Sequence, residues 1–431
     1  MRRRVTSAIL TAALAMATRL PAQMADSAQA ARAHLRAANA ALQAGDTAAV
    51  LDAAARAVRA WPTQVAYRLT LARFAARAGR TELALRELDT VIALGAGWTD
   101  DDPLHAALAG VQGYAARLAR MQAAVAPLAR SRVLATLPDT LLHPEGIAWD
   151  GARRRFLVSS IRRRQVVAVD GQGRTSAFLG PGQDGLDAVI GLAVDSAAGL
   201  LWLTSRALPN QEGYSAADAG RSALLAFDLA TGALRRRVAG AGASLGDLTL
   251  GPDGTVYLSD DAGRAIHRLP PGGQALEAVT RGDPLLRSPQ GLVLAPDGTR
   301  LYVADWSHGL LLVDLATGRV RPVTLAAVGT LLGLDGLVLA GAGRLVAVQN
   351  GLAPPRVVAL SLDAAGERVV RLEVLDRHLP LASEPTVGVL AEGALVYVAN
   401  SPWANYDEAG VPLPGAAWPA PVLLRLPLRP Q

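Results

Sequence analysis

The sequence predicts an all-β six-bladed β-propeller that follows an N-terminal all-α domain. Two observations support this fold class. A short apolar segment recurs six times after residue 133, whereas the chain before residue 129 has helical periodicity and few strand-forming residues. The chain has 431 residues, of which 51% are hydrophobic and 19% charged, so it has a globular composition and enough length for two domains.

Residues 1–22 are predicted to be a signal peptide. Arg2–Arg4 form a basic start, Val5–Ala17 an apolar stretch of 13 residues, and Leu20-Pro21-Ala22 a cleavage end. The apolar stretch is shorter than the roughly 20 residues that a membrane-spanning helix needs. We therefore expect a periplasmic or secreted protein with no membrane span after the signal is removed.

The composition excludes several classes of function. The absence of cysteine excludes disulfides, thiolate metal ligands and a cysteine nucleophile. The formal net charge is +6, but four arginines of the predicted signal peptide account for most of it and leave +2 for the remainder. This balance is not that of a nucleic-acid-binding protein.

Residues 27–129 are predicted to form the helical domain. Gly45 and Gly79 end two helices and lie 34 residues apart, and Ala38 and Ala72 keep the same separation. The period and the small residues resemble a pair of tetratricopeptide repeats, with a third helix at residues 103–129. Two interpretations remain open: the repeats dock a protein partner, or they are a helical cap that packs on the next domain.

Residues 133–431 are predicted to form the propeller. The six repeats begin 45, 56, 44, 45 and 51 residues apart, and each contains two short strands separated by a Gly, Asp or Pro turn. Repeats of this length fit four-stranded blades arranged around a channel. The segment Arg132–Thr136 is expected to supply the outer strand of the last blade. Two long inserts, at residues 206–222 and 401–420, interrupt blades two and six.

Two columns of residues are expected at one mouth of the channel, because neighbouring strands of a blade are antiparallel. The first column begins the first strands and consists of Glu145, Ile190, Gly246, Gln290, Asp335 and Thr386. The second column ends the second strands and consists of Ser160, Ser205, Asp260, Asp305, Gln349 and Asn400. Both inserts are expected to rise on this face.

The first column predicts a site for a divalent cation. Glu145 and Asp335 stand where other blades have Ile, Gly or Thr, and Gln290 adds an amide oxygen. Carboxylate and amide oxygens are the ligands that calcium prefers. Asp253 and Asp297 lie in Pro-Asp-Gly turns and are expected to bind their own turns instead.

These motifs resemble the gluconolactonase and senescence-marker-protein family of six-bladed propellers. The resemblance rests on Glu145-Gly-Ile-Ala-Trp, Gln290-Gly-Leu and Asp335-Gly-Leu-Val-Leu. It implies that Glu145, Gln290 and Asp335 hold one divalent metal, with Gln290 in place of the family's Asn, and that Asp335 is also catalytic. The family's substrate-contacting Asn is Gly246 in this chain, while the Asp that follows it is kept as Asp247, a candidate for substrate binding.

Loops at the predicted mouth provide further candidates. Arg162, with its two arginine neighbours, is expected to attract an anionic substrate, and Asn350 and Asn400 are expected to line a pocket beneath the inserts. Other aromatic and imidazole side chains in these loops are Trp306, Trp403, Tyr214, His143 and His308.

The sequence therefore supports two hypotheses of function. The first is an exported, metal-dependent hydrolase of lactones or related small-molecule esters that acts at the channel mouth. The alternative is a noncatalytic propeller that binds a ligand or protein and uses the helical repeats as a docking scaffold.

Overall fold

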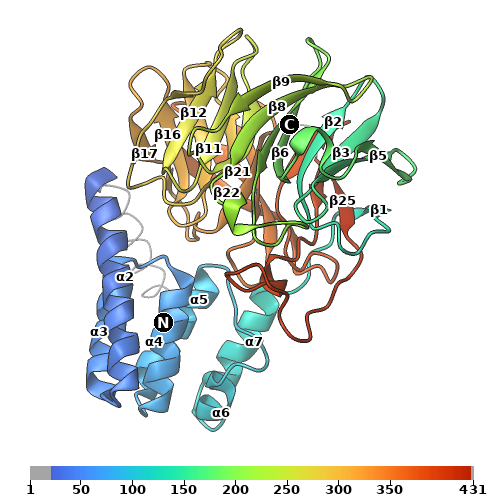
Figure 1. Cartoon of the computed structure of the whole chain (residues 1–431). Coiled ribbons are helices and arrows are strands. Elements are labelled where there is room, and N and C mark those ends of the chain that lie inside the picture. The colour runs from blue at the N-terminus through green and yellow to red at the C-terminus, as the bar shows by residue number, and fades with distance from the viewer. Residues whose placement is uncertain (1–20, 429–431) are drawn as a thin grey trace.

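A computed structural model describes residues 21–428 and shows six small sheets around a channel, with helices packed at one end (Figure 1). This arrangement confirms the predicted fold class. Residues 1–20 of the predicted signal peptide lie outside the described residues. None of the described helices has the length and apolarity needed to cross a membrane.

Six α-helices form the N-terminal region of the described chain. They are α2 (Pro21–Gln43), α3 (Thr47–Ala60), α4 (Val65–Arg77), α5 (Thr81–Ala93), α6 (Leu104–Leu108) and α7 (Tyr114–Ala124). Gly45 and Gly79 follow α2 and α4 with φ of +75° and +69°, which confirms the two predicted helix ends. The prediction of one helix at residues 103–129 is wrong. The chain turns at Gly113, whose φ is +84°, and so forms two helices there.

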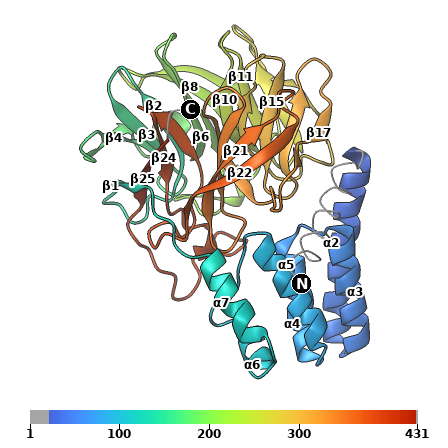
Figure 2. The same cartoon turned by 180° about the vertical axis from the view of Figure 1, so that it is seen from behind.

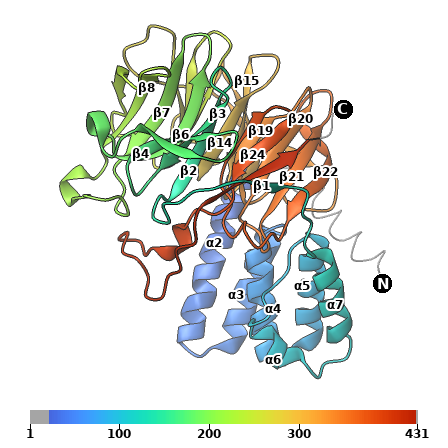
Figure 3. The ribbon, with the colours of Figure 1, turned by 90° about the vertical axis from the view of Figure 1, so that its right-hand side faces the viewer.

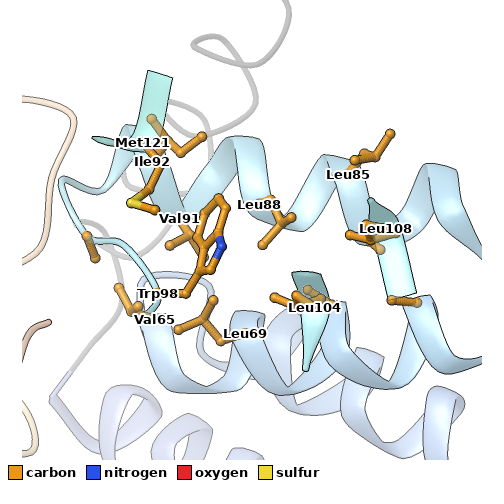
Figure 4. Close-up of a cluster of buried hydrophobic side chains, with 14 of the residues drawn as sticks. Val65, Leu69, Leu85, Leu88, Val91, Ile92, Trp98, Leu104, Leu108 and Met121 are labelled. Atoms are coloured by element: carbon orange, nitrogen blue, oxygen red, sulfur yellow. The ribbon is translucent and has the colours of Figure 1, made fainter. Parts of the chain in front are cut away.

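The core of this region lies between α4, α5 and the α6–α7 segment. Leu88, Leu104 and Leu108 are fully buried, and Trp98 packs among them (Figure 4). The apolar faces of short helices therefore cover one another, as the helical periodicity predicts. Whether this region acts as a set of tetratricopeptide repeats stays a prediction.

The blades follow in chain order. Blade one contains β2 (Pro144–Asp150), β3 (Arg155–Ser160), β4 (Gln165–Asp170) and β5 (Thr175–Leu179). Blade two contains β6 (Ala188–Asp195), β7 (Leu200–Arg206), β8 (Ser222–Asp228) and β9 (Leu234–Ala239). Blade three contains β10 (Leu245–Leu250), β11 (Val256–Asp260), β12 (Ala265–Leu269) and β13 (Glu277–Ala278).

The remaining blades keep the same antiparallel pattern. Blade four contains β14 (Pro289–Leu294), β15 (Arg300–Asp305), β16 (Gly309–Asp314) and β17 (Val320–Pro322). Blade five contains β19 (Leu334–Leu339), β20 (Arg344–Gln349), β21 (Arg356–Leu362) and β22 (Arg368–Arg377), with β18 (Thr324–Leu325) parallel to its outer edge. Blade six contains β23 (Gly388–Ala391), β24 (Ala394–Val398) and β25 (Val422–Pro427).

The last blade is completed by β1 (Arg132–Thr136), which comes from the start of the propeller. This strand pairs with β25 in antiparallel register, with Arg132 opposite Arg425 and Thr136 opposite Val422. The predicted closing strand is thus confirmed. Hydrogen bonds between the two ends of the domain close the ring of blades without a disulfide.

The inner strands approach one another closely around the channel. A Cβ atom on Gly146 would collide with the carbonyl oxygen of Ile190, and one on Gly336 would lie 2.6 Å from the Cα of Val387. The hydroxyl of Ser159 links two blades at this level, because it accepts from the Gly146 N–H (2.6 Å) and donates to the Ile190 carbonyl (2.9 Å). Glycine is therefore needed where two inner strands meet.

The helical region packs against one side of the propeller (Figures 2 and 3), where it contacts the loops after β15 and β20. The loop after β20 meets it, since the Gly97 N–H donates to the Ala353 carbonyl at 2.9 Å and Arg356 donates to the Gly95 carbonyl at 3.3 Å. Trp61 lies against His308 in the loop after β15, with 5.8 Å between ring centroids. The structure thus shows a packed helical cap, and a role in docking a partner stays a prediction.

Replacing Gly146 by alanine is expected to destabilise the propeller. The new methyl group must displace the inner strand of blade two, and overpacking of this kind costs about 1–3 kcal/mol in the free energy of unfolding. Chemical denaturation measures this loss. Gly171→Ala is the matched control, because a Cβ added there would meet nothing within 4 Å beyond its chain neighbours, and its effect should stay within about 0.5 kcal/mol. Equal stability of the two variants would contradict the close-packing argument.

Candidate functional site

A pocket of about 340 Å³ opens at the channel mouth. It brings together residues from several blades and from the insert of blade six. Of the residues predicted from the sequence, those that line it are Glu145, Ile190, Gly246, Gln290 and Asp335 of the first column, together with Asn350, Trp306 and Trp403. The predicted ligand set is therefore assembled in one place by the fold.

The first strands of blades one, four and five each contain a β-bulge. The bulge turns the side chain of the first-column residue toward the pocket. The pairing register shifts between Pro144 and Ile147 in β2, and at the corresponding places in β14 and β19. A bulge bends the strand locally and redirects a side chain. Glu145 lies within the bulge of β2, which explains how a residue in a buried strand faces the channel mouth.

Glu145 is a buried carboxylate with neutral hydrogen-bond partners. The residue is 7% exposed, and its Oε2 accepts hydrogen bonds from Trp403 Nε1 (2.8 Å) and Ser401 Oγ (3.1 Å), both in the blade-six insert. Burial, followed by the negative charge of Asp335, raises the pKa of Glu145 well above its usual range. The ionised form of this group thus needs a positive charge nearby.

Asp335 is in a similar environment in blade five. It is 6% exposed, and Asn350 Nδ2 donates to its Oδ2, while its Oδ1 has no hydrogen-bond partner in the described part of the chain. Burial, followed by the charge of Asp247, raises the pKa of Asp335 to about 7. An unpartnered buried carboxylate oxygen that faces a pocket is a natural place for a cation or a proton donor.

Gln290 contributes an amide to the same pocket. Its Nε2 donates to Ser288 Oγ at 3.1 Å, which leaves the amide oxygen available as an acceptor. Two carboxylates and one amide oxygen suit a hard divalent cation. Within residues 21–428, however, no three His, Asp or Glu side chains form a group that could hold a metal ion. A metal site here needs oxygen donors besides these side chains, and the amide of Gln290 is one candidate.

Asp247 lies beneath the pocket rather than in it. It occupies the position where the inner strands of blades one, two, four and five carry glycine, and it lines a smaller channel cavity of about 60 Å³ with Gly146 and Gly291. Burial raises the pKa of Asp247 to about 6, an effect opposed by the charge of Arg206. The structure therefore separates Asp247 from the substrate-sized pocket and makes it an electrostatic neighbour of Asp335.

The residues of the predicted second column do not face the channel mouth; in four blades the residue that follows each of them in the sequence does. The residues that end the second strands are buried and bind the loops next to them: Asp305, for example, accepts from the backbone N–H groups of Ser288 and His308. Side chains alternate along a strand, so the following residue faces the mouth. The residues at that following position that line the pocket are Arg206, Asp261, Trp306 and Asn350.

Asn400 and Arg162 do not line the pocket. Asn400 joins the two ends of the blade-six insert, because its side chain donates to the Ala420 carbonyl (3.0 Å) and accepts from the Val422 N–H (2.8 Å). The Nε atom of Arg162 lies 3.7 Å from Oε1 of Glu212 in the blade-two insert. The expectation that Asn400 lines the pocket is wrong, and attraction of a substrate by Arg162 stays a prediction.

The two candidate histidines are packing residues. His143 is fully buried, stacks on Tyr406 and meets the edge of Trp403, and burial lowers its pKa to about 3. His308 is buried beside Trp61, and burial lowers its pKa to about 4. Neither lines the pocket, so the expectation that they face the channel mouth is wrong.

Sequence reasoning missed three ionisable residues of the pocket. Arg206 is the last residue of β7, Asp261 directly follows β11, and Glu384 precedes Thr386 of the first column by two residues. Arg206 Nη1 lies 3.2 Å from both carboxylate oxygens of Asp261. The alternation of side chains along the strand could have identified the first two, whereas Glu384 lies in an irregular segment without a repeat signal.

Comparison with known proteins shows similarity of fold only. No family model and no curated protein matches the chain. Among solved structures, a gluconolactonase from Xanthomonas campestris is 21% identical, with 70% of this chain and 91% of that chain covered and a TM-score of 0.44. The calcium-binding protein regucalcin from Agrobacterium tumefaciens is 16% identical, with 69% and 98% covered and a TM-score of 0.45. Virginiamycin B lyase from Staphylococcus aureus is 13% identical, with 70% and 89% covered and a TM-score of 0.44.

Replacing Asp247 by asparagine is expected to lower the pKa of Asp335 from its raised value. The negative charge of Asp247 disfavours the ionised form of Asp335, and removing that charge favours it. Carbon-13 NMR of labelled aspartate carboxyl groups, recorded over pH in the presence of chelator, measures the change. Asp253→Asn is the control, because that carboxylate binds Thr255 of its own turn. An Asp335 pKa near 4 in the parent protein would contradict the electrostatic account.

Proposed function

We propose that this protein is an exported hydrolase of lactones or related esters that holds one divalent cation, calcium, through Glu145, Gln290 and Asp335. The observation that carries the proposal is the pair of buried, electrostatically coupled carboxylates at one pocket, with Asp335 Oδ1 left unpartnered among the described residues. The sequence motifs around these residues support the same assignment.

The charges of the pocket favour a cation at these carboxylates. A buried ionised carboxylate is costly unless a positive charge or a proton compensates it. Arg206 is the one cationic side chain among the described residues that line the pocket, and it is paired with Asp261. Calcium takes six to eight oxygen ligands, so three protein oxygens leave room for water and a substrate carbonyl.

Glu145, Gln290 and Asp335 would hold the cation, which would act there as a Lewis acid toward the substrate carbonyl and water. Asp335 Oδ1 accepts a proton from the attacking water as the water oxygen bonds to the carbonyl carbon. The bond from that carbon to the ring or ester oxygen then breaks, and the proton passes from Asp335 to the departing oxygen. The product is a hydroxy acid, or an acid and an alcohol.

Asn350 positions the catalytic carboxylate. Its Nδ2 donates to Asp335 Oδ2 and to the Pro385 carbonyl at 3.0 Å, and its Oδ1 accepts from Trp306 Nε1 at 2.9 Å. This network fixes one oxygen of Asp335 and leaves the other, Oδ1, without a partner among the described residues. Asn350 is therefore a positioning residue, with an indirect effect on the rate.

Asp335→Asn is expected to lower kcat/KM on a panel of lactones by roughly 10²–10⁴, the usual contribution of a general base. Chelation should remove the same activity, and elemental analysis of the purified protein should find one divalent metal per chain. Glu408→Gln serves as control, since this exposed residue lies in the blade-six insert away from the pocket. A metal-free protein with the same background rate in parent and variant would rule out the hydrolase.

The same experiment tests the alternative function. A stoichiometric metal without turnover of any lactone or ester supports a noncatalytic binding propeller in which the metal is structural. Loss of the metal in both Glu145→Gln and Asp335→Asn then locates it at the proposed site.

A further inference from the structure

The pocket carries more negative charge than one divalent cation and one arginine neutralise. Its carboxylates are Glu145, Asp261, Asp335 and Glu384. Arg206 balances Asp261, with both carboxylate oxygens at 3.2 Å, and the proposed cation balances Glu145 and Asp335. Glu384 remains without a cationic counterpart in this arrangement.

Glu384 is held so that it borders the pocket. The backbone N–H groups of Ala404 (Oε2 at 3.2 Å) and Trp403 donate to its carboxylate, and neither partner is charged. These bonds fix the carboxylate between the blade-six insert and the start of blade six. A carboxylate that borders a pocket and has only neutral hydrogen-bond partners suits a bound ligand with positive charge or hydrogen-bond donors.

Two indole rings border the same region. Trp306 is 44% exposed although it lines the pocket, which is unusual for so large an apolar side chain. Its ring is held by the hydrogen bond to Asn350 and by contact with Gly351, where a Cβ would lie 3.0 Å from Trp306 Cε2. A rigid, exposed aromatic surface costs little entropy when a ligand binds to it.

Hydrogen bonds connect the segment of Glu384 to both tryptophans. Trp403 is anchored through Nε1 to Glu145, and its own backbone N–H contacts Glu384. On the other side, Asn350 joins Trp306 to the carbonyl of Pro385, the residue next to Glu384. One carboxylate and two aromatic side chains thus line the same pocket.

We propose that Glu384, Trp306 and Trp403 form an ammonium subsite, so that the ester or lactone acted on at Asp335 carries a positively charged amine. This inference rests on the proposed function for the reacting end of the substrate. Indole faces attract organic cations through their quadrupole, and a carboxylate adds charge complementarity. Glu384 would also repel substrates with a carboxylate or phosphate at that position.

An organic cation suits this subsite better than a second metal ion. Calcium requires six to eight oxygen ligands, whereas the subsite offers one carboxylate and two apolar rings. An ammonium group with alkyl substituents is weakly hydrated and gains from contact with aromatic faces. The composition of the subsite therefore favours an organic ammonium ion over a metal ion.

Binding of tetramethylammonium to the full chain tests the subsite directly. Titration followed by tryptophan fluorescence and calorimetry, with calcium present and ionic strength held constant by sodium chloride, is expected to show saturable binding. Glu384→Gln and Trp306→Leu should each weaken the affinity about tenfold, in the range of a partly desolvated cation–π contact. Glu408→Gln should bind like the parent protein, and tert-butanol, a neutral probe of similar shape, should not compete.

Two outcomes would overturn the subsite. One is equal affinity of the parent and Glu384→Gln for tetramethylammonium. The other is complete loss of tetramethylammonium binding when one equivalent of calcium is added to protein prepared without metal, which would place both cations at Glu145 and Asp335. Circular dichroism of each variant checks that it is folded, and Glu384→Gln is nearly isosteric with the parent residue. A protein without metal or turnover that still binds tetramethylammonium through Glu384 would reject the hydrolase and retain the subsite.

If the protein is active, a second measurement uses turnover. An amino-substituted lactone and its N-acetylated counterpart differ in charge at one position and share the same reacting ring. The parent should prefer the charged compound in kcat/KM by about tenfold, and Glu384→Gln should lose that preference, measured as the ratio of kcat/KM for the two compounds within the same variant. An unchanged preference in the variant would overturn the assignment of Glu384.

Discussion

The close approach of inner strands around the channel is the constraint on which the rest of the propeller depends. Neighbouring blades meet where Gly146, Gly191, Gly291 and Gly336 leave no room for a Cβ atom. The pairing register shifts at the same level of each inner strand, so the residue before the glycine is directed to the mouth. The packing of the blades and the placement of the pocket side chains therefore have the same origin. Where two blades meet, the inner strands also direct Glu145, Gln290 and Asp335 to the pocket.

Blade three departs from this pattern, and the departure sets the electrostatics of the site. Its inner strand has Gly246 at the mouth and Asp247 at the glycine level, so a third carboxylate lies in the channel beneath the other two. Its charge raises the pKa of both Asp335 and Glu145. Three acidic groups in a confined, poorly solvated space oppose folding when all are ionised, which is a common feature of functional sites.

The blades, the closing strand and the first column follow from the sequence because they are local and periodic. Each repeat carries its own apolar strands and turn, and Glu145 and Asp335 are conspicuous against Ile, Gly and Thr at the same position. The second column was displaced by one residue because a strand end does not reveal which way its last side chain points. Asn350 and Trp306 face the pocket while Asp305 and Asn400 bind loops. The position of Glu384 depends on an irregular segment, and the burial of both histidines depends on contacts with residues far away in the sequence. A single sequence carries no periodic signal for either.

The helical region contributes to the pocket through the turn between β15 and β16. Trp306 and His308 lie two residues apart in this turn and face different surroundings: the indole borders the pocket, and the imidazole packs against Trp61 of the helical region. His308 is held by the Leu285 carbonyl at 2.7 Å, and the Trp306 N–H donates to the Ser288 carbonyl at 3.0 Å, so the turn has little freedom. The partners Leu285 and Ser288 belong to the propeller, whereas the helical region reaches the turn through the contact between Trp61 and His308. The helical region thus packs against the turn that carries one of the residues of the pocket.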